Sequence, residues 1–227
     1  MHAIEIRPEI IARVMARRGR LHLFEKLTPT KTALVVIDMQ NTFLYPGAPV
    51  EVPKGREIVA NINRLTARLR EISVPVIWVT HANSSSEGKS DWPGFFDHFV
   101  TAEVRQKTVD GLAPGAEGQK IWPELDVASE DAQIFKNRYS ALIAGSSSLE
   151  SLLLGQGIDT LLIAGTKTNV CCESTARDAM MLDFKTVMLS DCCAALSDEE
   201  HRSTLETMIQ QFGDVMTMDE ALAALQK

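Results

Sequence analysis

The chain alternates short, unbroken apolar runs with longer stretches in which apolar residues recur every three or four positions. An unbroken apolar run is typical of a strand buried on both faces of a parallel sheet, and the longer spacing is typical of a helix with one buried face. The pattern predicts strands over residues 33–38, 74–82, 131–136, 158–165, 185–190 and 214–218. Strands that alternate with helices in this way predict a three-layer α/β/α domain, Rossmann-like in general form, with a mainly parallel sheet of about six strands.

Helix starts are indicated by residues that accept hydrogen bonds from the free N–H groups of a first turn. Ser147 with Glu150, and Ser197 with Glu200, have the spacing of capping boxes. A further helix is predicted over residues 55–72, where apolar residues recur at helical spacing. These residues are Ile58, Ile62, Leu65 and Leu69. A last helix is expected after the sixth strand.

Residues 1–30 are predicted to form a helical arm outside the main domain, which would comprise residues 31–227. The run IIARVMARRGR has its apolar residues at helical spacing. Residues 1–32 hold seven basic and three acidic side chains, whereas the remainder of the chain has a net charge of −11. The arm is therefore expected to lie across an acidic surface, either of this chain or of a neighbouring subunit.

The overall charge narrows the choice of partners. A net charge of −7 and a pI near 5.3 predict no general attraction to nucleic acid or to anionic lipid. No apolar run approaches the roughly 18 residues that span a bilayer, and the start MHAIEIRPEI lacks the features of a secretory signal. We therefore expect a cytoplasmic protein that binds neither nucleic acid nor membrane.

The four cysteines form two adjacent pairs, Cys171 with Cys172 and Cys192 with Cys193. Neighbouring cysteines rarely meet disulfide geometry, and neither pair has the CxxC spacing of a zinc or redox site. A buried cysteine usually serves as a small apolar residue. That role is expected for Cys172, Cys192 and Cys193.

Three reactive side chains fall where the predicted strands end. Asp38 ends the first strand and Lys136 the third, and Cys171 lies in the first turn of a helix that begins near Thr168 or Asn169, after the fourth strand. Ligands of open α/β sheets bind beyond the carboxyl ends of the strands, where loops and helix N-termini meet. We therefore expect these three side chains at one edge of the sheet.

Together the three side chains can perform acyl transfer. A helix N-terminus and the Lys136 ammonium are expected to lower the pKa of the Cys171 thiol, and Asp38 can accept the thiol proton and later donate it to a leaving amine. Each residue taken alone has a more common role, as a cap, a solvated lysine or a buried apolar side chain. The combination of the three favours catalysis.

Three segments carry a family resemblance, namely VVIDMQNTF (35–43), FKNRYSAL (135–142) and IAGTKTNVCCESTARDA (163–179). In this order they closely resemble the signature segments of isochorismatase-like cysteine hydrolases. The resemblance extends over about residues 32–220 and implies that the predicted α/β domain has the isochorismatase-like fold.

The resemblance also implies roles for individual residues. Asp38, Lys136 and Cys171 match the family's Asp-Lys-Cys triad, and the backbone N–H groups of Lys167 and Cys171 match its oxyanion hole. A cis peptide bond is expected between Thr166 and Lys167. The family usually has a small residue where this chain has Lys167, so that side chain must either turn away from the pocket or enter it.

The same comparison argues against a metal. Nicotinamidases of this superfamily hold a metal with an Asp and histidines that follow the first strand. Here the corresponding stretch, LYPGAPVEVPKG, contains no histidine. We therefore expect neither a metal nor another cofactor.

The expected reaction is hydrolysis of a C–N bond in a small molecule. KNRYSA and TNVCCESTARDA look most similar to ureidoacrylate amidohydrolases, and N-carbamoylsarcosine amidohydrolase is a more distant likeness. We expect Cys171 to attack an amide, carbamoyl or ureido carbonyl and to release ammonia or an amine through a thioester or thiocarbamate intermediate. Two alternatives stay open: vinyl-ether hydrolysis, as in true isochorismatases, which typically lack the cysteine, and non-catalytic binding.

Five residues are predicted to contact the substrate. His81 follows the second strand, and the alternative for it is a structural hydrogen bond to the backbone. Asn137 and Tyr139 belong to the KNRYSA segment, while Trp92 and Phe95 lie in a long loop, where packing under the loop or a subunit contact is the alternative.

The connection over residues 83–130 is rich in Ser, Gly and Pro, and its pattern does not predict its path. Its aromatic residues and the basic N-terminal arm agree with a homodimer or homotetramer, which is common in the family.

Overall fold

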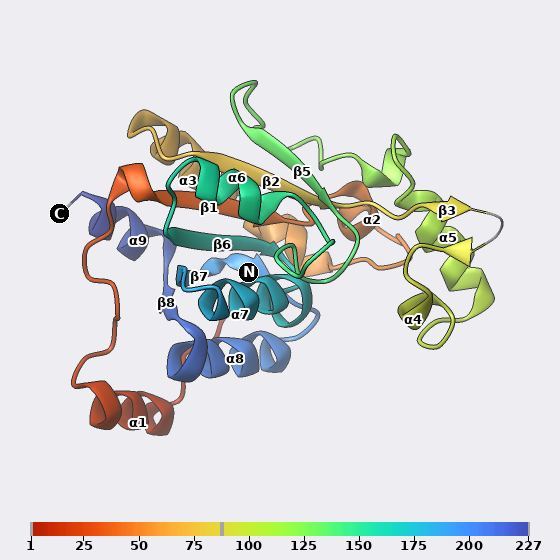
Figure 1. The fold of residues 1–227 in the computed structure, drawn as a ribbon. Helices are drawn as coiled ribbons and strands as arrows, with labels where there is room; N and C mark the ends of the chain where they lie inside the picture. The colour runs from red at the N-terminus through yellow and green to blue at the C-terminus, as the bar shows by residue number, and fades with distance from the viewer. Residues whose placement is uncertain (1, 87–88, 227) are drawn as a thin grey trace.

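The structure is a computed structural model that describes residues 2–86 and 89–226 (Figure 1). Its centre is a six-stranded sheet in the order β5-β2-β1-β6-β7-β8, in which every neighbouring pair is parallel. The strands are β1 (Thr32–Ile37), β2 (Val76–His81), β5 (Ala132–Lys136), β6 (Thr160–Thr166), β7 (Lys185–Ala194) and β8 (Asp214–Met216). The predicted fold class is therefore confirmed.

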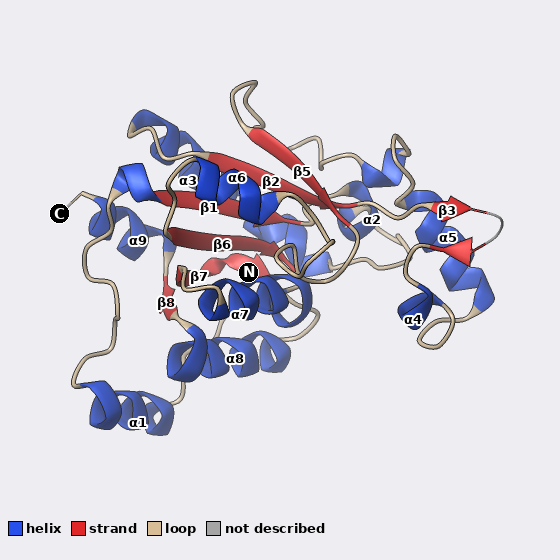
Figure 2. Ribbon diagram, in the orientation of Figure 1, coloured by secondary structure: helices blue, strands red, loops and turns tan. Residues whose placement is uncertain are grey.

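Helices cover both faces of this sheet (Figure 2). One face carries α3 (Val59–Glu71) and α9 (Met218–Leu225), and the other carries α6 (Leu149–Gly155), α7 (Glu173–Met181) and α8 (Asp198–Thr207). Because successive side chains of a strand point to opposite faces, β1 contributes to two cores: Leu34 and Val36 to the first, Val35 and Ile37 to the second. In the described part of the chain, none of the helices is long and apolar enough to cross a membrane.

The helix predicted over residues 55–72 begins differently in the structure. Its first part is a 3₁₀-helix, η2 (Pro53–Ile58), and regular α-helix starts at Val59. The tighter turn brings Gly55 against Leu44, where an added Cβ would lie 2.8 Å from the leucine side chain. The buried stripe at helical spacing is present as predicted.

One of the two predicted capping boxes is wrong. The helix α6 begins at Leu149 without a side-chain cap, because Ser147 lies too early to form the box. The Ser147 hydroxyl accepts a hydrogen bond from the N–H of Leu149 at 3.0 Å and donates one to the carbonyl of Ala141 at 2.6 Å. The second box, made by Ser197 and Glu200 at the start of α8, is confirmed.

Two strand ends also differ from the prediction. β7 does not stop at residue 190 but continues to Ala194, past a shift in its register with β6. β8 ends at Met216, because Thr217 caps the N-terminus of α9 with its side chain.

The N-terminal arm contains the predicted helix, α1 (Pro8–Arg18), and packs against its own chain. The Arg7 guanidinium donates to both carboxylate oxygens of Glu206 on α8. Asp214 is fully buried and accepts a hydrogen bond from the N–H of Leu23 at 2.6 Å. The acidic surface that the arm covers therefore belongs to this chain.

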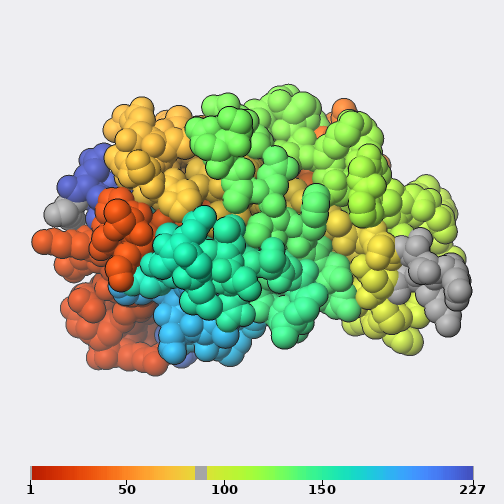
Figure 3. Space-filling view, turned by 45° about the horizontal axis from the view of Figure 1, so that its top comes forward, coloured from red at the N-terminus to blue at the C-terminus, as the bar shows by residue number. Residues whose placement is uncertain are grey.

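The long connection after β2 folds into a lobe beyond the carboxyl ends of the strands, at the right of Figures 1 and 3. It contains a small antiparallel pair, two short helices and a 3₁₀ turn, whose bounds are β3 (Ser85–Ser86), β4 (Lys89–Ser90), α4 (Pro93–Phe96), α5 (Ala102–Gly111) and η3 (Glu117–Gln119). The remaining short elements are η1 (Pro29–Lys31), α2 (Asn41–Leu44), η4 (Thr168–Cys172) and η5 (Met208–Phe212). The lobe stands over the edge of the sheet where Asp38 and Lys136 are found.

All four cysteines are free. Cys172, Cys192 and Cys193 are completely buried within the two cores, as predicted for small apolar residues.

Candidate active site

Asp38 is the first residue after β1, and the backbone turns sharply at this position, where φ is +52°. Its N–H donates to the carbonyl of Val79 at 2.8 Å, and its carbonyl accepts from the Thr166 hydroxyl at 2.9 Å. Left-handed backbone is uncommon for a residue other than glycine, and Asp tolerates it better than most. These bonds to β2 and β6 hold the Asp38 side chain at the carboxyl edge of the sheet.

The neighbouring strand β6 approaches β1 closely because of Gly165. This residue has φ of +115°, and an added Cβ would lie 2.0 Å from the carbonyl oxygen of Ile37. Only glycine fits such a position. The close approach places the loop that follows Thr166, which leads to Cys171, beside Asp38.

Lys136 ends β5 and is almost completely buried. Its ammonium group donates to Asp38 Oδ2 at 2.8 Å, to His81 Nδ1 at 3.1 Å and to the carbonyl of Arg138 at 3.1 Å. The edge strand β5 and the central strand β1 are separated by β2, so this contact joins the ends of three strands.

Asp38 and Lys136 form a buried ion pair. Burial raises the pKa of Asp38, although the Lys136 ammonium acts in the opposite direction. Burial also acts to lower the pKa of Lys136, but attraction to Asp38 and Cys171 outweighs it, and the pKa lies above its usual value. Lys136 therefore remains an ammonium group.

Cys171 lies in η4, the turn that begins at Thr168, as predicted, and continues into α7. Its thiol interacts with both Asp38 and Lys136. Among the described residues, the buried Oδ1 of Asp38 has no hydrogen-bond partner. Burial and the Asp38 charge raise the pKa of Cys171 to about 12, and Lys136 offsets only part of this effect. The prediction of a lowered thiol pKa is therefore wrong, because the ion pair presents its negative as well as its positive member to the thiol.

The resting protein should therefore carry a neutral thiol at Cys171. Since the thiolate fraction rises about tenfold per pH unit below the pKa, alkylation by iodoacetamide is expected to be about 100 times faster at pH 9 than at pH 7. The rate of loss of the Cys171 peptide mass, with the Cys171→Ala protein as blank, measures this. A plateau near neutral pH would contradict a raised pKa.

A cavity of about 120 Å³ lies over Cys171 at this edge of the sheet. Its wall is mostly apolar and aromatic, and Cys171 itself is only 6% exposed. The residues of the wall are Phe43, Val50, His81, Asn83, Trp92, Phe95, Phe96, Leu112, Tyr139, Lys167, Val170 and Cys171. Asp38 and Lys136 are not among these residues, so Cys171 is the member of the triad that borders the cavity.

Four of the five predicted substrate contacts lie in this wall. Trp92 packs edge-on against Tyr139, with ring centroids 4.7 Å apart, and stacks near His81 at 6.1 Å. Phe95 packs against Trp92 at 5.1 Å. Asn137 does not belong to the wall: its amide reaches toward Asp91 at 3.5 Å, so it ties its loop to the lobe instead.

The backbone around Lys167 matches the predicted arrangement. The peptide bond between Thr166 and Lys167 is cis, and both Lys167 and Cys171 lie in the wall of the cavity. The carbonyl of Lys167 accepts from the N–H groups of Val170 and Cys172, at 3.2 and 3.1 Å, which shapes the turn before α7. Lys167 therefore borders the cavity.

Comparison with known proteins agrees with this geometry. The model of the isochorismatase domain matches residues 32–220. The chain belongs to the isochorismatase family.

Individual relatives differ in their named activities. The chain is 32% identical over 200 residues to a ureidoacrylate amidohydrolase of Acinetobacter baylyi, covering 83% of this chain and 81% of the relative. It is 35% identical over 179 residues to a probable inactive nicotinamidase of Arabidopsis thaliana, covering 78% and 87%. Among solved structures, a cysteine hydrolase from Pseudomonas syringae superposes with a TM-score of 0.80 at 28% identity, covering 91% of this chain and 97% of the other.

The sequence did not single out two residues that shape the site of this family member. Gln40 clamps the backbone of His81: its amide donates to the His81 carbonyl at 2.9 Å and accepts from the His81 N–H at 2.7 Å. Asn83 lies in the cavity wall and contacts His81 Nε2 at 3.0 Å. Each is a polar residue just beyond the end of a buried strand, which is the signal that identified Asp38.

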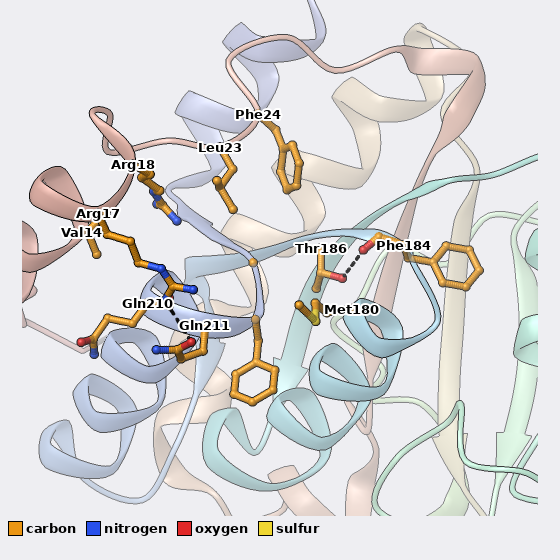
Figure 4. Close-up of a pocket in the computed structure, with 12 residues that line it drawn as sticks. Val14, Arg17, Arg18, Leu23, Phe24, Met180, Phe184, Thr186, Gln210 and Gln211 are labelled. Atoms are coloured by element: carbon orange, nitrogen blue, oxygen red, sulfur yellow. Dashed lines mark hydrogen bonds between the residues drawn. The ribbon is translucent and has the colours of Figure 1, made fainter.

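A larger cavity, of about 360 Å³, lies between the arm and the main domain (Figure 4). It is bordered by Leu23 of the arm and by Phe184 and Thr186, which flank the start of β7, so it lies at the opposite edge of the sheet. The Arg17 guanidinium in its wall donates to Gln211 Oε1 at 3.0 Å. This larger cavity therefore lies at the contact between the arm and the main domain, and it is distinct from the site at Cys171.

No cluster of three or more His, Cys, Asp or Glu side chains suited to a metal ion is present in residues 2–86 and 89–226. Asp38, the acidic residue of this isochorismatase-family site, forms an ion pair with the ammonium group of Lys136.

Proposed function

We propose that this protein is a cysteine hydrolase that cleaves an amide, carbamoyl or ureido C–N bond of a small molecule. One observation carries the proposal: Cys171 borders a small cavity and interacts with a buried Asp38–Lys136 ion pair. A thiol beside a proton acceptor and a fixed cation has the groups that nucleophilic acyl transfer requires.

The first half of the reaction uses Asp38 as a base. As the sulfur of Cys171 bonds to the substrate carbonyl carbon, its proton passes to Asp38, and the carbonyl oxygen becomes an oxyanion. The tetrahedral intermediate collapses, the C–N bond breaks, and the nitrogen takes the proton from Asp38. Ammonia or an amine leaves, and the acyl or carbamoyl group remains on the sulfur. Lys136 keeps its charge throughout and holds Asp38 in place.

The second half releases the acyl group. A water molecule attacks the thioester or thiocarbamate, giving its proton to Asp38, and the C–S bond breaks. The departing thiolate then recovers the proton from Asp38, so that the enzyme returns to its resting state. The raised pKa of Cys171 suits this order of reaction steps, because it favours the neutral thiol between turnovers.

The backbone N–H groups of Lys167 and Cys171 are proposed to bind the oxyanion. Both residues border the cavity, and Cys171 lies in the first turn of the helix that continues into α7, where N–H groups point outward. Donors fixed at the place where charge develops stabilise the transition state more than the ground state.

The cavity wall indicates a small substrate with an apolar part and an anionic group. Trp92, Phe95 and Tyr139 supply aromatic surface. Lys167 is the one lysine or arginine among the described wall residues, and burial together with Lys136 lowers the pKa of His81 well below its usual value, so that His81 is neutral. A carboxylate on the substrate would complement the Lys167 ammonium.

The Arabidopsis relative carries the name of a probable inactive nicotinamidase, which favours a second candidate function, that of a non-catalytic binding protein. Asp38, Lys136 and Cys171 are all present here, which supports catalysis instead. Vinyl-ether hydrolysis, the third candidate, does not require a thiol, and Cys171 would then have no chemical role.

A screen for ammonia release across ureido acids, neutral amides and small ureas tests the proposal, with the Cys171→Ala protein as blank. We expect turnover of at least one compound, with carboxylate-bearing ureido or amido acids preferred over neutral amides of the same size. Equal release by both proteins on every compound would exclude the proposed reaction.

A further inference from the structure

A chain of hydrogen bonds runs from the ion pair to the cavity wall, and its direction is fixed at Lys136. An ammonium group has donors and no acceptor. The ring nitrogen that faces it, His81 Nδ1 at 3.1 Å, must therefore be the one that carries the lone pair.

This assignment determines the other side of the ring. With Nδ1 accepting, the proton of the neutral imidazole lies on Nε2, which donates to Asn83 Oδ1 at 3.0 Å. Burial and the charge of Lys136 lower the pKa of His81 well below its usual value, in agreement with a neutral ring. Both nitrogens of His81 are thus occupied inside the protein.

The same argument orients Asn83. Its oxygen must face His81, so its Nδ2 group faces elsewhere, and the N–H of Asn83 is held by the carbonyl of Leu112 at 2.9 Å. Asn83 is fully buried and lies in the cavity wall, and within the described residues its Nδ2 has no acceptor. Buried donors in folded proteins nearly always have a partner. The described residues therefore leave this donor open to an acceptor in the cavity.

We propose that Asn83 Nδ2 donates a hydrogen bond to a carbonyl or carboxylate oxygen of the bound substrate, in a direction set by Lys136 through His81. Asn83 is then a substrate-binding residue, and His81 is a positioning residue that neither gives nor takes a proton. Because the substrate is placed beside Cys171, this role rests on the proposed function.

Binding can be measured without turnover in ¹⁵N-labelled Cys171→Ala protein. The side-chain amide signal of Asn83 is assigned by its loss in the Cys171→Ala/Asn83→Asp protein. Titration with acetamide, urea and acetate is expected to shift this signal, and to shift it downfield with at least one of the three. If the Asn83 signal stays in place with all three probes, whether or not the Trp92 indole signal moves, the assignment of Asn83 is overturned.

Kinetics provide the second test, with two variants that remove the donor in different ways. Asn83→Asp keeps an oxygen for His81 Nε2 but has no N–H, and Asn83→Leu has neither donor nor charge. On a compound that the parent hydrolyses, both are expected to lower kcat/KM about 100-fold, and the thermal midpoint of each variant shows whether its fold is retained.

The two variants separate charge from hydrogen bonding. Parent-like kcat/KM in Asn83→Leu, even with a loss in Asn83→Asp, would show that the added charge and not the missing donor matters, and would overturn the role. If the parent hydrolyses no compound at all, the proposed function fails, and the binding experiment alone decides the role of Asn83.

Discussion

Replacing Cys171 with alanine is expected to lower kcat by about 10⁴-fold or more on any compound that the parent hydrolyses. The reason is its position: among the described residues, Cys171 is the one member of the Asp38–Lys136–Cys171 group that borders the cavity. Asp38 and Lys136 exchange or hold protons in the proposed reaction, but neither replaces the sulfur as nucleophile. Ammonia release under saturating substrate measures the effect, with circular dichroism to verify that the fold is retained.

The adjacent cysteine offers a matched control. Cys172 is fully buried and contacts the carbonyl of Ala164 through its sulfur at 3.8 Å, on the core side of the same turn. Cys172→Ala is expected to keep kcat within a few-fold of the parent and to lose about 1 kcal/mol of stability through the lost packing. Full activity in Cys171→Ala would contradict the covalent mechanism and favour vinyl-ether hydrolysis.

The sheet and the triad could be predicted because both depend on local signals. A strand buried on both faces must be apolar throughout, so β1 and β6 stand out in the chain, and a polar residue at the end of such a run is noticeable. Parallel strands bring their carboxyl ends to one edge, which is sufficient to expect Asp38 beside Lys136. The expectation holds although the two residues lie far apart in the sequence.

The cavity could not be predicted in the same way. Five of the twelve residues in its wall come from the connection between β2 and β5, whose path the sequence pattern does not predict. Asn83 and Leu112 lie far apart in sequence and are joined by one backbone hydrogen bond of 2.9 Å. Such a contact follows from the path of the loop, which local residue patterns do not determine. For the same reason the sequence pattern did not show that Asn137 lies outside the cavity wall.

The thiol pKa shows a different limit of sequence reasoning. A helix N-terminus and a lysine both favour a thiolate, and both can be identified from spacing. The pKa of Cys171 also depends on burial and on the Asp38 charge, and these two effects outweigh that of Lys136. The sign of a pKa shift therefore requires the three-dimensional arrangement, even where the residues themselves are identified correctly.

Replacing Lys136 with methionine is expected to remove activity and to lower the free energy of unfolding by about 3–5 kcal/mol. Methionine fills a similar volume but leaves the Asp38 carboxylate buried without its cation. It also leaves His81 Nδ1 without its donor. Urea denaturation at neutral pH measures the stability, and the screened substrate measures the activity.

The pH dependence of this loss identifies Asp38 as its source. Without Lys136, the pKa of Asp38 rises further in the folded state, so the folded protein binds a proton more readily than the unfolded chain. Stability then falls as pH rises through the folded pKa and recovers as pH falls toward about 4, the value of an unfolded aspartate. The double variant Lys136→Met/Asp38→Asn should regain most of the stability at neutral pH and show no such dependence, yet remain inactive. A deficit in Lys136→Met that is the same at pH 5 and pH 8 would mean that packing, and not an unpaired carboxylate, accounts for the loss.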